Sequence, residues 1–170
     1  MENGLGREIS KEETRDILKQ AAESGLVHAI SNWVEGADTI CNCCRCCCLF
    51  FEAYHVLKHD KSHDVSNYRV RINSETCKAC GLCVKRCPMD ALRLEDSHLA
   101  TNKKGKAAVL DAELCLGCGV CVYKCPTQSL ILERKEEIAH PSKDAREWME
   151  RWYKDKKAGA AGNSLGNSRD

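Results

Sequence analysis

The chain has 170 residues, of which 43% are hydrophobic, so it is long enough for one modest domain with appendages but too short for a large catalytic core. Its 26 basic and 25 acidic residues leave a net charge of +1, which excludes an overall electrostatic attraction to nucleic acid or anionic lipid. Fourteen cysteines are the least ordinary part of the composition.

The amino-terminal residues contain no apolar stretch that could form the core of a signal peptide, because charges interrupt residues 1–13. The longest apolar run, residues 46–51, is much shorter than the roughly 20 residues that a membrane-spanning helix needs. We therefore expect a cytoplasmic protein without direct membrane insertion, for which any membrane association would need a partner subunit.

The first predicted helix covers residues 10–24. Ser10 and Glu13 form a capping-box pattern, and Gly25 supplies a stop signal. A narrow apolar stripe at helical spacing indicates that this helix packs on another part of the chain.

Residues 41–48 hold six thiols in eight positions, a density that packing alone does not require. We expect this segment to bind metal. The candidate ligands of this site are Cys41, Cys43, Cys44, Cys46, Cys47 and Cys48.

A short predicted helix over residues 49–58 follows the cysteines and should cover them with an apolar side formed by Leu49, Phe50, Ala53 and Leu57. Histidines then recur every four residues, but their charged neighbours favour a solvated helix end over a metal site for His55, His59 and His63. Residues 59–66 form a polar linker, which closes a helical cysteine-rich region over residues 1–65.

An internal repeat occupies residues 66–135. The pattern C-x2-C-x2-C-x3-C-P occurs twice, first at Cys77, Cys80, Cys83 and Cys87 and again at Cys115, Cys118, Cys121 and Cys125. Around each copy we expect a strand, a cysteine loop, a short helix and a second strand, which gives an α+β fold. Residues 68–72 should pair with 130–132, and residues 91–94 with 107–110.

The connection over residues 95–106 is longer than the repeat requires. We expect a solvated hairpin loop, because surface loops tolerate insertion well. A basic docking contact through Lys103 and Lys104 is the alternative.

The carboxyl-terminal segment, residues 136–170, is predicted to contain an amphipathic helix and a flexible tail from residue 158 onward. Pro141 suits the first helical turn. An apolar stripe at helical spacing should be buried, either on the chain itself or against another subunit, through Ala145, Trp148, Met149 and Trp152.

Each cysteine run resembles the ligating run of bacterial two-[4Fe–4S] ferredoxins and of the equivalent domains in multisubunit oxidoreductases. The resemblance implies a ferredoxin-like dicluster βαββαβ repeat with two [4Fe–4S] clusters. It also implies that the last cysteine of each run binds the other cluster, so that the ligand sets are Cys77, Cys80, Cys83 and Cys125 for one, and Cys115, Cys118, Cys121 and Cys87 for the other. Zinc knuckles are disfavoured, because they usually separate two C-x2-C pairs by a longer spacer.

The function implied by the resemblance is low-potential electron transfer, as a ferredoxin or as the electron-transfer subunit of an anaerobic oxidoreductase. The partner would be a redox protein or a catalytic subunit. Basic side chains flank the first run, so we expect its cluster to have the higher potential, since cations favour the more negative reduced state; these residues are Lys78, Lys85 and Arg86.

The cysteine-rich segment leaves several interpretations open. A third iron–sulfur cluster is favoured because of the local supply of cysteines. It would use Cys41, Cys44 and Cys47, although Phe51 stands where a fourth ligand would fall, or another subset with a ligand from Cys43, Cys46, Cys48 or a histidine. Zinc or another thiolate-bound metal, reversible thiol chemistry and an inert buried group are the alternatives. A second function follows from this segment: a small redox enzyme or metal–thiol protein whose active centre is residues 41–48, supplied with electrons by the two clusters.

Overall fold

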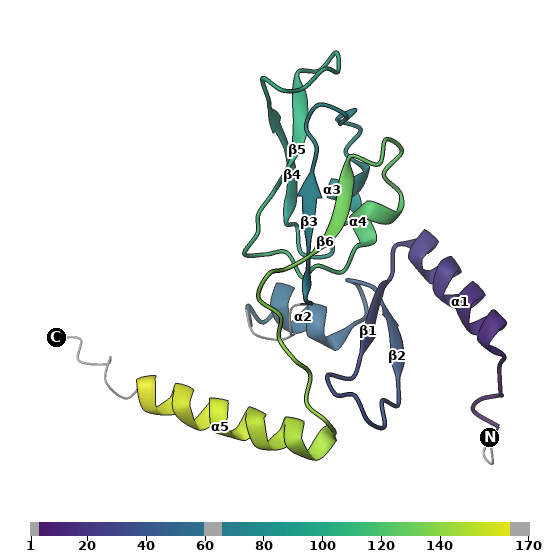
Figure 1. The fold of residues 1–170 in the computed structure, drawn as a ribbon, viewed down its shortest axis with the longest axis vertical. Helices are drawn as coiled ribbons and strands as arrows, with labels where there is room; N and C mark the ends of the chain where they lie inside the picture. The colour runs from purple at the N-terminus through teal and green to yellow at the C-terminus, as the bar shows by residue number, and fades with distance from the viewer. Residues whose placement is uncertain (1–3, 60–65, 164–170) are drawn as a thin grey trace. The chain divides into compact units, whose positions relative to one another are not determined.

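The structure, a computed structural model, describes residues 4–59 and 66–163, with side chains to residue 155. His63, most of the expected linker and residues 164–170 lie outside these ranges. Within them, helices and two-stranded sheets make an α+β fold (Figure 1). The chain divides into two compact units, one of residues 1–29 with 41–138 and one of residues 30–40 with 139–170.

Helix α1 (Lys11–Ser24) begins and ends where the sequence predicts. The Ser10 side chain accepts a hydrogen bond from the Glu13 backbone N–H at 3.1 Å, and Gly25 follows the helix with a φ of 88°. The carboxyl end of α1 is held by Arg86, whose guanidinium donates to the carbonyls of Ala22 at 2.6 Å and Glu23 at 3.2 Å. These contacts satisfy helix carbonyls that have no partner within the helix.

The amino-terminal region is not purely helical, which corrects the expectation from sequence. Strands β1 (Val27–Ile30) and β2 (Ile40–Cys43) pair in a two-stranded sheet. His28 Nδ1 and Asn42 Oδ1 lie 2.8 Å apart across this pair. Each strand is only four residues long and mostly exposed, so the sequence lacks the apolar alternation that would predict a strand there.

Helix α2 (Leu49–His55) begins where predicted but ends three residues earlier, and it buries a different side chain. Phe51 is only 4% exposed, whereas Leu49 is 77% and Phe50 62% exposed. The buried side is therefore set by Phe51, which packs in one apolar group with Val27, Met89, Ala91 and Val120. The apolar face expected from sequence was wrong, because a helix of two turns leaves the choice of face to its tertiary contacts.

The repeat forms two strand pairs with two short helices. Strand β3 (Tyr68–Ile72) pairs antiparallel with β6 (Leu130–Arg134), and β4 (Leu92–Asp96) pairs antiparallel with β5 (Lys106–Leu110), which confirms both predicted pairings. Helices α3 (Leu82–Arg86) and α4 (Val120–Tyr123) begin just after the second cysteine of their copies and contain the third (Figure 1). The first and last strands of the repeat are thus neighbours.

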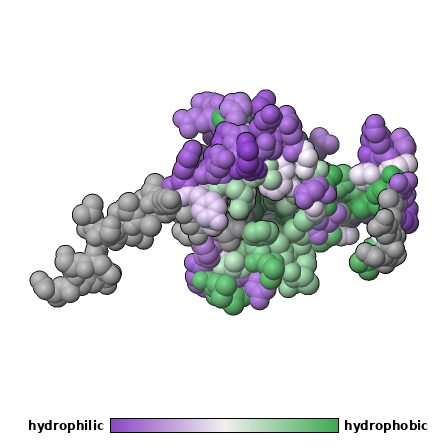
Figure 2. All heavy atoms as spheres, turned by 90° about the horizontal axis from the view of Figure 1, so that it is seen from below, coloured by the Kyte–Doolittle hydropathy of each residue, from purple (hydrophilic) through white to green (hydrophobic). Residues whose placement is uncertain are grey.

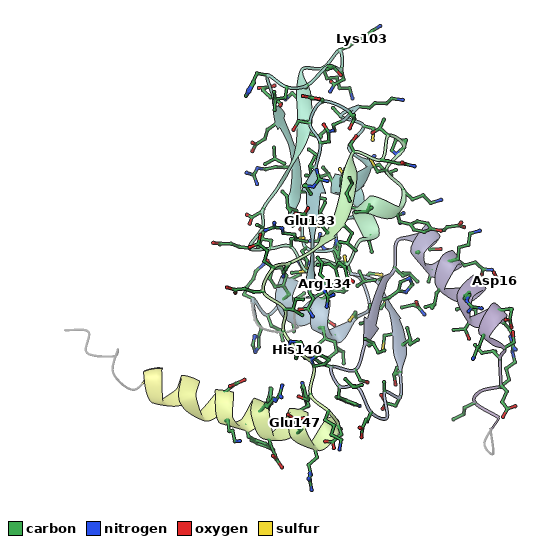
Figure 3. The ribbon with its side chains drawn as sticks, in the orientation of Figure 1. Asp16, Lys103, Glu133, Arg134, His140 and Glu147 are labelled. Carbon is green, nitrogen blue, oxygen red and sulfur yellow. The ribbon has the colours of Figure 1, made fainter. Side chains whose placement is uncertain are left out.

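The β3–β6 pair carries a cross-strand charge cluster. Glu133, labelled in Figure 3, accepts hydrogen bonds from Arg69 Nε at 2.9 Å and Arg71 Nε at 3.0 Å. The hydrogen bond from Arg69 lowers the pKa of the Glu133 carboxyl, so this residue is ionised near neutral pH.

In the second unit, the segment before β2 meets the chain ahead of α5 (Ala145–Asn163). Trp33 forms a parallel bridge with Ser142, and its ring lies 5.9 Å from that of Trp148. The predicted tryptophan stripe is only partly buried, since Trp152 remains 41% exposed. Helix α5 continues to residue 163, beyond the point where sequence composition indicates flexibility.

Apolar surface is unevenly distributed on the face drawn in Figure 2, where hydrophobic side chains gather beside strongly hydrophilic ones. In the part of the chain that the structure describes, no helix combines the length and apolar character needed to cross a bilayer.

Candidate metal centres

The two cysteine loops have matching backbones. Gly81 and Gly119 precede α3 and α4 with φ values of 77° and 76°. Two positions earlier, just before the second cysteine of each run, Ala79 has a φ of 50° and Gly117 a φ of 72°. This left-handed conformation favours glycine, and at Gly117 space adds a second requirement, because a Cβ there would lie 1.9 Å from the Tyr68 carbonyl oxygen.

The first cavity of the repeat is lined by thiols from both cysteine runs. Its walls include Cys77, Cys80 and Cys83 of the first run and Cys125 of the second. The empty space, counted out to its opening to solvent, is about 300 Å³. Leu94 and Leu130 complete the apolar part of the wall.

The second cavity mirrors the first. Cys115, Cys118 and Cys121 of the second run line it together with Cys87 of the first run. Its empty space, counted in the same way, is about 330 Å³. The structure therefore brings the eight cysteines of the repeat into two groups of four, each drawn from both runs.

Three of the eight thiols that line these cavities are buried, four are half-buried and one is exposed, and burial affects their protonation. Burial raises the pKa of Cys121 to about 12 and also raises the pKa values of Cys118 and Cys83. In the metal-free protein these groups are therefore neutral thiols near pH 7. Because metals bind thiolates, metal binding at either cavity must release protons.

The first cysteine loop has a support that the sequence did not reveal. Asn102 donates from Nδ2 to the Cys77 carbonyl at 2.7 Å, and Lys104 donates from Nζ to the Ala79 carbonyl at 3.0 Å. The long β4–β5 connection thus contacts the first loop through part of its length, whereas Lys103 lies at its tip (Figure 3). The only signal in the sequence was the excess length of the connection.

The cysteine-rich segment divides its thiols into two groups. Cys41 and Cys43 lie on β2 and share one face of it, because side chains alternate along a strand. Cys48, just before α2, joins them, and Cys43 and Cys48 both pack against the apolar group around Phe51. Burial, followed by the effect of the neighbouring Cys48 and Cys41 thiols, raises the pKa of Cys43 to about 12.

The second group occupies the turn between β2 and α2. The Sγ atoms of Cys44 and Cys46 are 2.8 Å apart, those of Cys46 and Cys47 are 3.6 Å apart, and all three lie within 4.8 Å of one another. Hydrogen bonding with Cys46 lowers the pKa of Cys44. The predicted three-residue register is not brought together, since Cys41 belongs to the other group.

This turn is anchored beside the first proline of the repeat. Arg45 Nη1 lies 2.6 Å from Asp90 Oδ1, and Arg45 Nη2 lies 3.3 Å from His55 Nδ1. His55 Nε2 donates to the Pro88 carbonyl at 2.7 Å, which leaves Nδ1 of the neutral ring to accept from Arg45. His55 is therefore engaged in holding the loop.

Comparisons with known proteins agree with these cavities. Residues 76–129 match the family described as "4Fe-4S dicluster domain". A stretch of 98 residues is 28% identical to "Pyruvate dehydrogenase [NADP(+)], mitochondrial" of Euglena gracilis and covers 48% of this chain but only 5% of that protein. Residues 76–129 of the chain are therefore a 4Fe-4S dicluster domain, which assigns this part of the molecule to iron–sulfur electron transfer.

Proposed function

We propose that the chain carries two [4Fe–4S] clusters and transfers single electrons at low potential, as a ferredoxin or as the electron-transfer subunit of an oxidoreductase. The observation that carries the proposal is the composition of the two cavities. Each groups three thiols of one cysteine run with the last thiol of the other, the ligation pattern of two-cluster ferredoxins.

The ligands would be held from both halves of the repeat. Cys77, Cys80, Cys83 and Cys125 would bind one cluster, and Cys87, Cys115, Cys118 and Cys121 the other. The clusters would supply one-electron chemistry. The protein's own contribution is to place the thiols, which lose their protons when the cluster binds, and to surround them with apolar side chains such as Leu94 and Leu110, which limit the access of water.

The order of elements supports a ferredoxin-like arrangement. Strand β3, helix α3 and strand β4 form the first half of the repeat, and β5, α4 and β6 form the second half in the same order. The outer strands of the two halves, β3 and β6, pair with each other. This pairing brings the proline turn after Cys125 back toward the first cysteine loop. Crossed ligation and the β3–β6 pair are thus two consequences of one topology.

The partner we propose is a redox protein or a catalytic subunit. The similarity to 5% of a large NADP-dependent pyruvate dehydrogenase is in keeping with a small module that passes electrons to or from a catalytic protein.

The test is anaerobic reconstitution of the full chain, followed by iron and sulfide analysis and reduction with dithionite. We expect about eight irons and about eight sulfides in the dicluster domain, a low-temperature paramagnetic signal on reduction, and reoxidation by a one-electron acceptor. A colourless protein with no paramagnetic signal after reduction would refute the proposal.

A further inference from the structure

Three thiols of the turn between β2 and α2 converge on one another, and none of them belongs to the two cysteine runs of the repeat. Cys44, Cys46 and Cys47 have their Sγ atoms within 4.8 Å of one another. Among the residues that the structure describes, this is the one group of three side chains close enough to bind a single metal ion. The eight cysteines of the repeat do not form such a group, because they stand around cavities.

Packing does not account for these three thiols. Free cysteine is among the most buried residue types, yet Cys46 and Cys47 are exposed and Cys44 is only half-buried. Cys43 and Cys48 differ, since both pack against the apolar group that contains Phe51. Packing therefore explains Cys43 and Cys48, but it does not explain the three thiols of the turn.

The spacing of the sulfur atoms selects the kind of metal. Four sulfurs at about 2.3 Å from a tetrahedral zinc ion lie about 3.8 Å from each other. The observed Cys46–Cys47 separation of 3.6 Å is close to this value, and the Cys44–Cys46 separation of 2.8 Å would have to widen by about 1 Å on binding. A cubane requires wider spacing, because each cysteine binds a different iron atom.

The turn is also held in place before any metal binds. The Cys48 backbone N–H donates to the Cys44 carbonyl at 3.2 Å and closes the turn. Arg45, between the first two thiols, is fixed by Asp90 and His55. Such anchoring reduces the loss of chain entropy on metal binding.

We propose that Cys44, Cys46 and Cys47 bind one zinc ion through three thiolates, with the fourth coordination position open to solvent. Binding forms three Zn–S bonds and releases the protons of those thiols that are not already ionised. Three protein ligands with an open position distinguish this site from closed structural zinc sites. This inference does not depend on the proposed electron-transfer function.

The experiment uses the full chain with its iron–sulfur clusters in place. Wild-type protein, Cys46→Ser/Cys47→Ser and Cys41→Ser are equilibrated anaerobically with one to two equivalents of zinc, desalted, and analysed for zinc and iron together. Because Cys41, Cys46 and Cys47 are all exposed, none of these substitutions removes a packed side chain. Zinc-edge X-ray absorption then reports the number of sulfur ligands.

We expect about one zinc per chain in the wild type and in Cys41→Ser, with three sulfur ligands and one lighter ligand, and loss of that zinc in Cys46→Ser/Cys47→Ser. The iron content should be the same in all three proteins. Three results would overturn the site: no zinc in the wild type, equal zinc in all three proteins, or loss of about four irons in the double variant, which would indicate a third cluster. Since iron reports the dicluster domain and zinc reports the turn, failure of one proposal is visible separately from failure of the other.

Discussion

The chain has two cysteine-rich regions that use thiols in opposite ways. In the dicluster domain, eight thiols from two distant sequence runs stand apart around two cavities, and all but Cys80 are at least half-buried. In residues 41–48, six thiols from one short run crowd together, and three of them are exposed. The denser run is thus the poorer candidate for a cubane, which shows that the separation of the sulfur atoms matters more than their number.

The two regions also differ in how their thiols are held. The dicluster loops depend on long-range contacts, because the β3–β6 and β4–β5 pairs bring the runs together. The turn between β2 and α2 depends on its own local geometry and on one anchor at Arg45. We therefore expect the dicluster domain to be the more sensitive of the two to substitutions far from any cysteine.

The largest effect should come from Gly117→Ala. The new Cβ would lie 1.9 Å from the Tyr68 carbonyl oxygen, and the residue would keep a strained positive φ. We expect destabilisation by about 3 kcal/mol or more, with loss of iron from the second cavity. Thermal unfolding and iron analysis of the anaerobic protein measure both.

The matched substitution for Gly117→Ala is Ala79→Gly, at the same position of the other loop. Ala79 already has a φ of 50°, so glycine relieves strain there and should leave iron content unchanged. If both variants lost the same amount of stability and iron, the two loops would not differ in the space and strain at this position.

The second effect concerns the anchor of α1. Arg86→Leu removes the hydrogen bonds to the carbonyls of Ala22, Glu23 and Val120. We expect a loss of about 1.5–3 kcal/mol in the free energy of unfolding and faster hydrogen exchange at the carboxyl end of α1. Lys85→Leu, at the exposed neighbouring position, is the control, and a similar loss there would remove the special role of Arg86.

A smaller effect should appear at the first cavity when Lys104 is changed to Met. Its amine contacts the Ala79 carbonyl within the first cysteine loop, so removing the charge should lower the potential of that cluster. We expect a shift of about 40 mV, which corresponds to about 1 kcal/mol for one electron. Redox titration followed by electron paramagnetic resonance measures it.

Lys103→Met is the control for the Lys104 variant, because Lys103 lies at the tip of the same connection. If both variants shifted the potential equally, the effect would come from overall charge and not from the contact. The structure also changes which cations bear on the potential of the first cluster. Arg86 is occupied by α1 and Val120, while Lys104, which the sequence indicated only for a docking contact, contacts the first cysteine loop.

The smallest effect should follow Glu133→Gln on the β3–β6 pair. The substitution removes the charge that Arg69 and Arg71 share, so the melting temperature should fall slightly at low salt. The difference from wild type should shrink in 1 M salt, because exposed ion pairs are screened. A difference that is independent of salt would indicate a packing effect instead.

Sequence reasoning was strongest where the signal is local. The caps of α1, the four strands of the repeat and the cysteine runs follow from short patterns, and the structure contains each of them. It failed where contacts between residues distant in sequence determine the local structure. The buried side of α2, the short strands β1 and β2, and the contact of Asn102 with the first loop depend on partners that are distant in sequence.

The division of the six loop thiols shows the same limit. The three-residue spacing of Cys41, Cys44 and Cys47 favours a helical or ferredoxin-type register. The end of β2 after Cys43 breaks that register, because the strand places Cys41 on one face and the turn then redirects the chain. A periodic pattern predicts proximity only while the backbone conformation stays constant.

The most direct test of the account is native mass spectrometry of two anaerobic double variants. Cys80→Ala/Cys125→Ala removes two ligands of one proposed cluster, so one intact [4Fe–4S] cluster should remain. Cys80→Ala/Cys87→Ala removes one ligand from each proposed cluster, so neither should remain intact. The reverse result, with the intact cluster in the second variant, would show that each run binds its own cluster and would contradict crossed ligation.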